Sequence, residues 1–436
     1  MAFTPQNNPI TARLGRVQAE YMVMREKKEI KLCRWLTEQD EIVMIHAFVT
    51  VENANEAVTP DLFIRLHTPF SPSNTYEQEL ITELETAWNA YQKEISPDKP
   101  VSPLVQRSKN NSEYPVLFIE ALRALADQAP EFEGHFVAFI DPSNFSSKSL
   151  WRQWIEKALQ AGIPDRVLLM TIDPLPGTLL ENSAKKFPSL VYTIKPTLDM
   201  PGAMRKIAAS GDPNEPGVQF RKLFVELSQH VSNGRIPQMR QTGEAALAIC
   251  IRCGWIYLQV AVYVAMAAGY MSKKQNKEAL QLYDRAIAIA RNGWKEGDMS
   301  TAKSLVQALF GKASILFGKK DFKAAALLYQ EAVAPATDAK DTIQIMEAWR
   351  MTGVCLELDN KGNEAWSCYN QGLLIGEQLD QSIRPVSTLP FLGKSLLNLG
   401  YALGKKQDEL IPLEQKMVTL CGVNWKELAN PKPSTN

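Results

Sequence analysis

The order of apolar and polar positions divides the chain into two regions with different periods. From residue 255 to about residue 420, apolar residues recur three and four positions apart over long stretches, which is the period of an amphipathic α-helix. Between about 40 and 200, short apolar runs rich in β-branched and aromatic residues alternate with amphipathic stretches of helical length. That alternation is typical of βαβ units around a parallel sheet. We therefore expect an α/β domain followed by an all-α domain.

Nine segments of the first region are predicted to be strands or helices. The predicted strands are Ile42–Val51, Asp61–Leu66, His135–Ile140, Arg166–Ile172 and Leu190–Ile194. The predicted helices are Tyr76–Gln92, Val116–Gln128, Ser147–Gln160 and Pro176–Lys186. Residues 93–113 are polar and proline-rich, so we expect a flexible excursion there.

Three segments of the second region repeat one pattern without gaps. Each has a small residue, a tyrosine four positions later and another small residue three positions after that: Ala279/Tyr283/Ala286, Ala325/Tyr329/Ala332 and Ala365/Tyr369/Gly372. A further small residue stands 16 positions before each tyrosine: Ala267, Ala313 and Gly353. Offsets of three and four lie on one helix face, and small side chains permit close helix crossings. The pattern resembles the tetratricopeptide repeat (TPR), in which tyrosine fills the gap between two closely packed helices.

The spacing of the repeats differs from that of the TPR family. The periods between the tyrosines are 46 and 40 residues, and the family period is about 34. We therefore expect longer loops between repeats. A degenerate fourth unit begins at Gly393, and Pro412 stands where the family has a small residue, which suits a terminal cap or a distorted helix. An unrelated helical array is the alternative.

The domain boundaries follow from these patterns. The expected division is an N-terminal arm and helix over 1–39, an α/β domain over 40–200, connecting helices over 201–254, TPR-like repeats over 255–430 and a disordered tail over 431–436. The expected fold is thus an α/β domain with a mostly parallel sheet, followed by an all-α repeat domain.

The first region resembles the core of a P-loop ATPase of the kind fused to TPR arrays in signalling proteins. Residues 61–72 would occupy the phosphate-loop position, and Val137–Asp141 resembles a Walker B strand ending in an acid. A phosphate loop needs glycines, a lysine and a Ser or Thr. Residues 67–75 contain neither Gly nor Lys, and two prolines remove backbone donors. We therefore expect P-loop-like topology without a Walker A motif, with Asp141 and Asp173 as polar residues at strand ends.

The residue pattern supports neither catalysis nor metal binding. The sequence has neither a G-x-S-x-G nor a G-x-G-x-x-G motif, and its four histidines lack metal-ligand spacing. Cys250 and Cys253 form a lone C-x-x-C inside an apolar helical stretch, which favours buried, reduced thiols. We expect no catalytic residue, no metal and no cofactor.

Charge and hydropathy limit the kinds of partner. The 48 basic residues balance 48 acidic ones, so no general attraction to nucleic acid or membrane is expected. No run approaches the ~18 apolar residues of a membrane span, and the N-terminus lacks the features of a secretory signal. The expected location is the cytoplasm, and the oligomeric state stays open.

The TPR resemblance implies a partner-binding surface on the first helix of each pair, which lines the concave side. The candidate residues are Gln307, Phe310, Ser314 and Phe317, then Glu347, Arg350, Val354 and Glu357, then Lys394 and Tyr401. Leu397 and Gly404 complete the fourth row, and the first row is Ala261, Val264, Ala268 and Met271. We expect inward positions to face away from the second helix. The surface lacks the Lys/Asn/Arg set that binds terminal carboxylates in chaperone-binding TPRs.

Short phrases outside the repeat pattern suggest a client. Residues 216–221, 347–351, 387–391 and 424–426 resemble phrases of a bacterial TPR family associated with contractile (type VI) secretion loci. That resemblance implies an adaptor or chaperone for a secreted effector or spike component. The alternatives are a STAND-like signalling regulator with residual nucleotide binding and an array that serves only in self-assembly.

Overall fold

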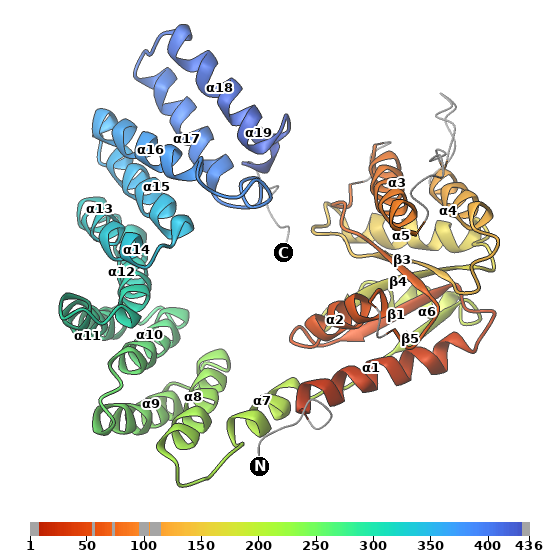
Figure 1. The fold of residues 1–436 in the computed structure, drawn as a ribbon, viewed down its shortest axis with the longest axis horizontal. Coiled ribbons are helices and arrows are strands. Elements are labelled where there is room, and N and C mark those ends of the chain that lie inside the picture. The colour runs from red at the N-terminus through yellow and green to blue at the C-terminus, as the bar shows by residue number, and fades with distance from the viewer. Residues whose placement is uncertain (1–7, 55–56, 72–74, 96–103, 105–114, 430–436) are drawn as a thin grey trace. The chain divides into compact units, whose positions relative to one another are not determined.

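The computed structural model describes residues 8–54, 57–71, 75–95, 104 and 115–429. The chain divides between Ile207 and Ala208 into two compact units (Figure 1). The first unit is an α/β domain with a parallel sheet, and the second is an all-α array of TPR-like helix pairs, as the sequence predicts. Most of the predicted excursion over 93–113 and the tail predicted over 431–436 lie outside the described residues.

A five-stranded sheet forms the centre of the first unit. Its strands are β1 (Leu32–Thr37), β2 (Leu62–Leu66), β3 (Phe136–Ile140), β4 (Val167–Pro174) and β5 (Val191–Ile194). The order is β2-β3-β4-β1-β5, and every neighbouring pair is parallel. All five residues of β3 are buried, as expected for a parallel strand covered on both faces.

Helices cover the two faces of this sheet separately (Figure 1). Alternate residues of β2 belong to different apolar clusters, Phe63 to one and Ile64 to the other, because successive strand side chains point to opposite faces. The Phe63 face is covered by α1 (Pro9–Arg25) and α2 (Ile42–Glu52). The Ile64 face is covered by α3 (Tyr76–Ile95), α4 (Val116–Gln128) and α5 (Lys148–Gln160). A short α6 (Glu181–Lys186) precedes β5, and α7 (Met200–Ala208) follows it.

Two predictions near the start of this unit are wrong. Ile42–Val51 is helix α2, and its buried Met44, Ile45, Phe48 and Val49 follow helical spacing. The strand missed by the prediction is β1, which lies between β4 and β5 within residues predicted as an arm and helix. Its Arg34 interrupts the apolar run, and this residue is buried only because Asp173 of β4 pairs with it at 2.7 Å. The other four predicted strands are confirmed to within two residues, whereas the helix predicted from Pro176 begins only at Glu181.

The described part of the second unit contains five antiparallel helix pairs. These are α8 (Pro216–Ser232) with α9 (Ile236–Arg252), α10 (Ile256–Ser272) with α11 (Asn276–Lys295), α12 (Ser300–Gly318) with α13 (Phe322–Glu331), α15 (Thr342–Leu358) with α16 (Gly362–Gly376), and α17 (Leu389–Ala402) with α18 (Gln407–Cys421). The short helices α14 (Val333–Asp338) and α19 (Trp425–Leu428) follow α13 and α18. The array thus extends back to α8, into residues predicted as connecting helices. Pro412 lies inside α18 without ending it.

The three repeated tyrosines fill gaps between helices, as predicted. Tyr283, Tyr329 and Tyr369 are at most 4% exposed. A Cβ added at Gly353 on α15 would lie 2.5 Å from the ring of Tyr369 on α16. A Cβ added at Gly311 on α12 would lie 2.3 Å from the ring of Tyr283 on α11. The tyrosine of one pair therefore also packs against the next pair, and this explains the need for small residues at these positions.

Candidate functional site

The first helices of the pairs provide the accessible inner surface of the repeat unit. In Figure 1, α8, α10, α12 and α15 lie along the inner side of this curved array, and α9, α11, α13 and α16 lie outside them. Each inner helix buries the sides that contact its neighbours. The residues that remain accessible include a row spaced three and four apart, which follows one helix face.

Helix α10 presents a row without any charge. None of its 17 residues is charged, and its row consists of Tyr257, Ala261, Val264, Ala268 and Met271. All five are at least partly accessible, and Tyr257 is 46% exposed. The opposite side of the helix contributes Val260, Val262, Met266 and Ala267 to the buried core of the array. Val264 and Met271 pack partly against that core, and Tyr257 and Ala268 are the exposed members of the row. The row is therefore a partly exposed apolar strip.

The predicted residues of α12 divide into two kinds. Gln307 and Ser314 are exposed, whereas Phe310 and Phe317 are half-buried. The ring of Phe310 stands edge-on to Tyr329 with 5.0 Å between centroids, and that of Phe317 packs against Phe322 at 5.5 Å.

Both partner rings lie on α13, the second helix of the same pair. The expectation that inward residues face away from the second helix is therefore wrong for Phe310 and Phe317. A phenyl ring is long enough to reach past the helix edge into the crossing, so these two residues support the pair as well as the inner surface.

On α15 the predicted residues are held by one another. Arg350 donates to Glu347 through Nε at 2.7 Å and through Nη2 at 2.6 Å, and Thr388 also donates to Glu347. Val354 is half-buried, and the exposed Glu357 accepts a hydrogen bond from the Tyr369 hydroxyl at 2.8 Å. The charge of Arg350 is thus already neutralised within the chain.

On α17 the predicted row is correct at some positions and wrong at one. Tyr401 is 61% exposed and Lys394 is half-buried, but Leu397 is buried at 4% exposure. The neighbouring Asn398 is exposed in its place. The register of this degenerate unit therefore differs by one position at its centre.

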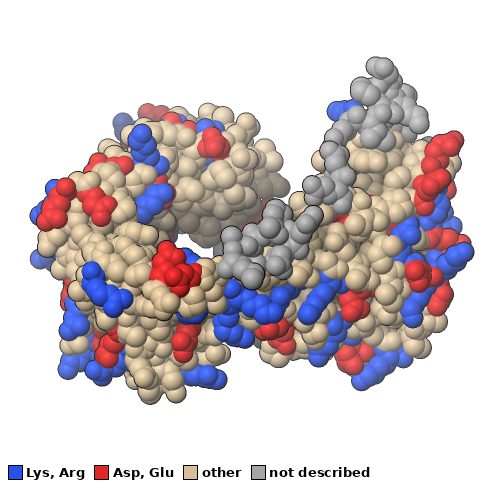
Figure 2. Space-filling model, turned by 60° about the horizontal axis from the view of Figure 1, so that its bottom comes forward, with Lys and Arg blue, Asp and Glu red and all other residues tan. Residues whose placement is uncertain are grey.

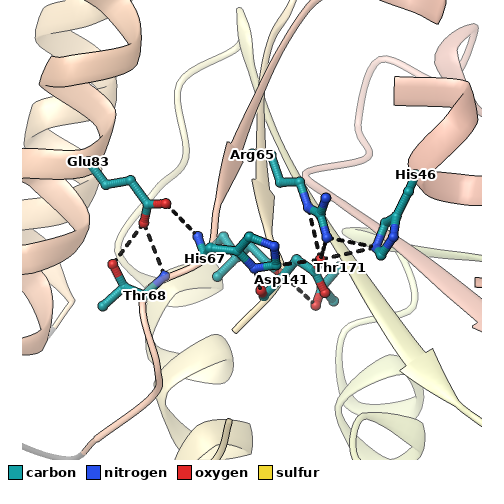
Figure 3. Close-up of polar contacts among 8 residues, drawn as sticks. His46, Arg65, His67, Thr68, Glu83, Asp141 and Thr171 are labelled. Atoms are coloured by element: carbon teal, nitrogen blue, oxygen red, sulfur yellow. Dashed lines mark hydrogen bonds and ion pairs between the residues drawn. The ribbon is translucent and has the colours of Figure 1, made fainter. Parts of the chain in front are cut away.

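The α/β unit carries a second polar cluster at the carboxyl ends of β2 and β3 (Figure 3). Arg65 donates to Asp141 Oδ2 through Nε at 3.0 Å and Nη2 at 2.6 Å, and His46 Nε2 lies 3.1 Å from the same oxygen. Burial and then the charge of Arg65 lower the pKa of His46. The sequence pointed only to Asp141 here, although Arg65 and His67, two apart at the end of the neighbouring strand, were a signal.

Two backbone donors of the segment predicted at the phosphate-loop position are occupied. It follows β2, the edge strand of the sheet. The backbone N–H groups of His67 and Thr68 donate to the carboxylate of Glu83 on α3, at 2.7 and 3.1 Å (Figure 3). A phosphate would need such donors. This segment is therefore built around a carboxylate of the protein itself.

The described residues offer neither a metal site nor a membrane-spanning helix. In the part of the chain that the structure describes, no three His, Cys, Asp or Glu side chains are grouped to hold a metal ion. Cys250 is buried, which raises the pKa of its thiol to about 11. No described helix has both the length and the apolar character needed to cross a membrane.

Comparisons with known proteins give only distant structural likenesses. No protein-family model matches the chain, and no curated protein matches it. The chain is similar to the crystal structure of BtubC from P. vanneervenii, with a TM-score of 0.39 and 19% identity over 50% of this chain and 89% of that one. It is also similar to the apo form of RapI, with a TM-score of 0.40 and 10% identity over 78% of this chain and 76% of that one.

A third likeness spans nearly the whole chain. A signal transduction ATPase with numerous domains (STAND) from Pyrococcus horikoshii, which has a tetratricopeptide repeat sensor, matches with a TM-score of 0.31 and 9% identity, over 94% of this chain and 90% of that one. TM-scores this low support no statement about the function of the chain.

Proposed function

We propose that this protein is a non-enzymatic adaptor or chaperone that binds a protein client along the inner surface of its repeat unit. The observation that supports this function best is the charge-free row of α10, with Tyr257 46% exposed. Tyrosine is among the residues that most often anchor protein interfaces, and charged residues are depleted at interface cores. A continuous apolar strip on a protein surface is typical of a contact site.

The polarity of the surface changes along the array, and this favours a segment of the client over a flat face. The α10 row is apolar, the α12 row adds the amide of Gln307 and the hydroxyl of Ser314, and α15 adds the Glu347–Arg350 pair. A helical or extended segment with an apolar end and a polar end would match this order. The type VI-like phrases support a secreted effector or spike component as the client.

Acidic residues argue against the alternative, a STAND-like regulator with residual nucleotide binding. The loop between β1 and α2 contains Glu38, Asp40 and Glu41, and together with Asp199 these acids line one cavity. The Glu41 carboxylate accepts hydrogen bonds from the backbone of Glu38 and Leu198. Acidic side chains at a helix N-terminus repel the phosphates that such a position otherwise attracts.

Nucleotide binding can be tested directly. We expect Mg-ATP or Mg-GTP at millimolar concentration to leave the thermal unfolding temperature of the full chain unchanged. A ligand at 100 times its dissociation constant would add about 2.7 kcal/mol of stability. A rise of several degrees would favour the regulator instead.

The adaptor function is tested by blocking the inner surface without disturbing the core. Ala268→Arg and Ser314→Arg place a long side chain on exposed inner positions of α10 and α12, and Ala288→Arg places the same side chain on an exposed position of the outer helix α11. Tagged full-length variants would be recovered from the cells that make the protein, and bound proteins quantified by mass spectrometry. We expect one client whose recovery falls at least tenfold with the inner variants and is unchanged with Ala288→Arg. Equal recovery with all variants would contradict the proposed surface.

A further inference from the structure

The turns that join the two helices of each pair share one backbone conformation. In each turn one residue has a positive φ: Gly234 at 63°, Lys274 at 59°, Lys320 at 63°, Asn360 at 61° and Gly404 at 69°. The next backbone N–H donates to a carbonyl in the last turn of the first helix, for example Gln275 to Tyr270 and Asp321 to Leu316, both at 2.9 Å. This is the common glycine-favouring end of a helix. Two of the five turns nevertheless have lysine at that position.

Basic residues accumulate in the first three of these turns. The group consists of Arg235, Lys273, Lys274, Lys277, Lys319, Lys320 and Lys323, which we name the basic edge. All seven are exposed, and only two acids, Glu278 and Asp321, belong to the same turns. Asp321 is engaged in capping α13 through the Ala324 N–H. Among the described residues, no carboxylate lies within ion-pair distance of any of the seven.

The members of the basic edge belong to neighbouring turns. A Cβ added at Gly234 would lie 2.2 Å from both Cε and Nζ of Lys273. The Lys273 side chain of the turn between α10 and α11 therefore lies against the turn between α8 and α9. The first helices of the three pairs, α8, α10 and α12, pack side by side, so their three turns follow one another along one edge of the array.

Helix dipoles explain only part of this arrangement. Lys273, Lys274, Lys319 and Lys320 follow helix C-termini, where positive charge is favourable. Lys277 and Lys323, by contrast, lie in the first turns of α11 and α13, where positive charge is unfavourable. The lysines at Lys274 and Lys320 also occupy a left-handed conformation that glycine adopts more easily. Helix stability therefore does not account for these residues.

The opposite edge of the same array has a different balance. Its turns, which join one pair to the next, contain Glu296, Asp298, Asp338 and Asp341 against Arg252, Lys295 and Lys340. Figure 2 shows that acidic and basic residues are interspersed over the face it draws. On a chain with zero net charge, the basic edge is a local excess.

We infer that the basic edge binds an acidic, extended polypeptide segment of the client. This inference rests on the proposed protein-binding function and adds the chemistry of a second contact. Packed helices lie about 10 Å apart, so three stacked turns span about 20 Å. An extended chain covers that length with about six residues, and alternate acidic side chains would all face the edge. The acidic opposite edge and the short strip disfavour a long polyanion such as a nucleic acid.

The experiment uses a labelled ten-residue peptide of alternating Glu and Ser, with a Gln/Ser peptide as the uncharged control. Binding to the full chain is followed by fluorescence anisotropy at 50 and 500 mM NaCl. The double variant Lys274→Gly/Lys320→Gly removes two charges and places at both sites the residue that the turn prefers. We expect it to weaken binding of the acidic peptide at least fivefold at low salt. Wild-type binding should weaken strongly at high salt because the contact is electrostatic.

Lys340→Gly is the matched control. Lys340 is exposed and has the same left-handed conformation, with φ at 54°, but it lies on the opposite edge. We expect this variant to change peptide affinity less than twofold. An equal loss with Lys340→Gly, no loss with the double variant, or equal binding of the Gln/Ser peptide would overturn the inference. Tighter binding of a ten-nucleotide single strand would also overturn it.

Failure of this inference is distinguishable from failure of the proposed function. Ala268→Arg should abolish client capture and leave affinity for the acidic peptide unchanged. A chain that captures its client through the inner surface but ignores the acidic peptide would refute the basic edge alone.

Discussion

The two units of this protein are stabilised by different kinds of contact. In the α/β unit, charged groups far apart in sequence meet in the interior: Arg34 and Asp173 pair at 2.7 Å with both side chains at most 2% exposed. Asp61 likewise accepts hydrogen bonds from Tyr21, Arg25 and the backbone of His135. In the repeat unit, the buried polar residues among those described are the threonines Thr242, Thr301 and Thr352. Its ion pairs, such as Arg291–Glu331, are partly exposed.

This difference predicts how the stability of each unit responds to a substitution. Removal of one partner of a buried ion pair strongly destabilises the fold, because the other charge stays buried. Apolar packing between neighbouring helices depends instead on volume and passes its effects to adjacent repeats.

The largest effect is expected from Asp173→Ala. It removes the buried partner of Arg34, which keeps only the partly exposed Glu181 as a carboxylate partner. It also removes the acceptor of the Leu179 and Leu180 N–H groups. Loss of one partner of a buried pair costs roughly 3–5 kcal/mol. Peptide-resolved hydrogen exchange should show loss of protection in β1 and β4 with the repeat unit unaffected. Asp165→Ala, which removes a fully exposed partner of Lys31, should leave protection unchanged.

In the repeat unit, Tyr329→Ala is expected to be comparably severe. Tyr329 is 3% exposed and packs against Phe310, so truncation leaves a cavity that costs roughly 3–5 kcal/mol. Hydrogen exchange should rise in α10–α16 and not in the sheet. Leu327→Ala in the same helix is the control, since Leu327 is 62% exposed. Protection lost only in α13 would show that the pairs are less coupled than their packing indicates.

A smaller, pH-dependent effect is expected at Glu77 of the α/β unit. Burial raises the pKa of Glu77 from 4.5 to about 7, and its Oε1 atom has no hydrogen-bond partner. The folded state therefore binds the proton more tightly than the unfolded state. The resulting stability is complete below pH 4.5 and is lost as the pH rises through 7. Glu77→Gln should raise the free energy of unfolding by about 2–3 kcal/mol at pH 8 and by nothing at pH 4. Urea unfolding at the two pH values measures this, and equal gains at both would contradict it.

The smallest effect is a gain in the repeat unit. Lys274→Gly and Lys320→Gly each relieve a left-handed lysine and should add about 1 kcal/mol or less. Thermal unfolding of the full chain would record the gain, and Lys340→Gly should behave alike. A loss of stability would show that the lysine stems pack usefully on their neighbours.

Sequence reasoning was most successful where structure depends on nearby residues. The tyrosine and its small partners lie within one helix pair, so spacing alone placed Tyr283, Tyr329 and Tyr369 in the gaps. The same spacing placed Gln307 and Ser314 on the accessible row of α12. It did not reveal that the Phe310 ring reaches Tyr329, because the length and direction of a side chain at a crossing depend on how the helices pack.

The sequence alone was therefore enough to predict the helical array and the positions of its small residues. It also showed that a phosphate-binding motif is absent. The tertiary structure was needed to show that Ile42–Glu52 is a helix and that Leu32–Thr37 is an interior strand of the sheet. An apolar run rich in β-branched residues suits either a buried helix or a buried strand, and periodicity does not separate the two. The strand contains an arginine whose burial depends on Asp173, 139 residues away. The basic edge likewise exists only in the fold, because stacking of the turns brings together lysines from separate repeats.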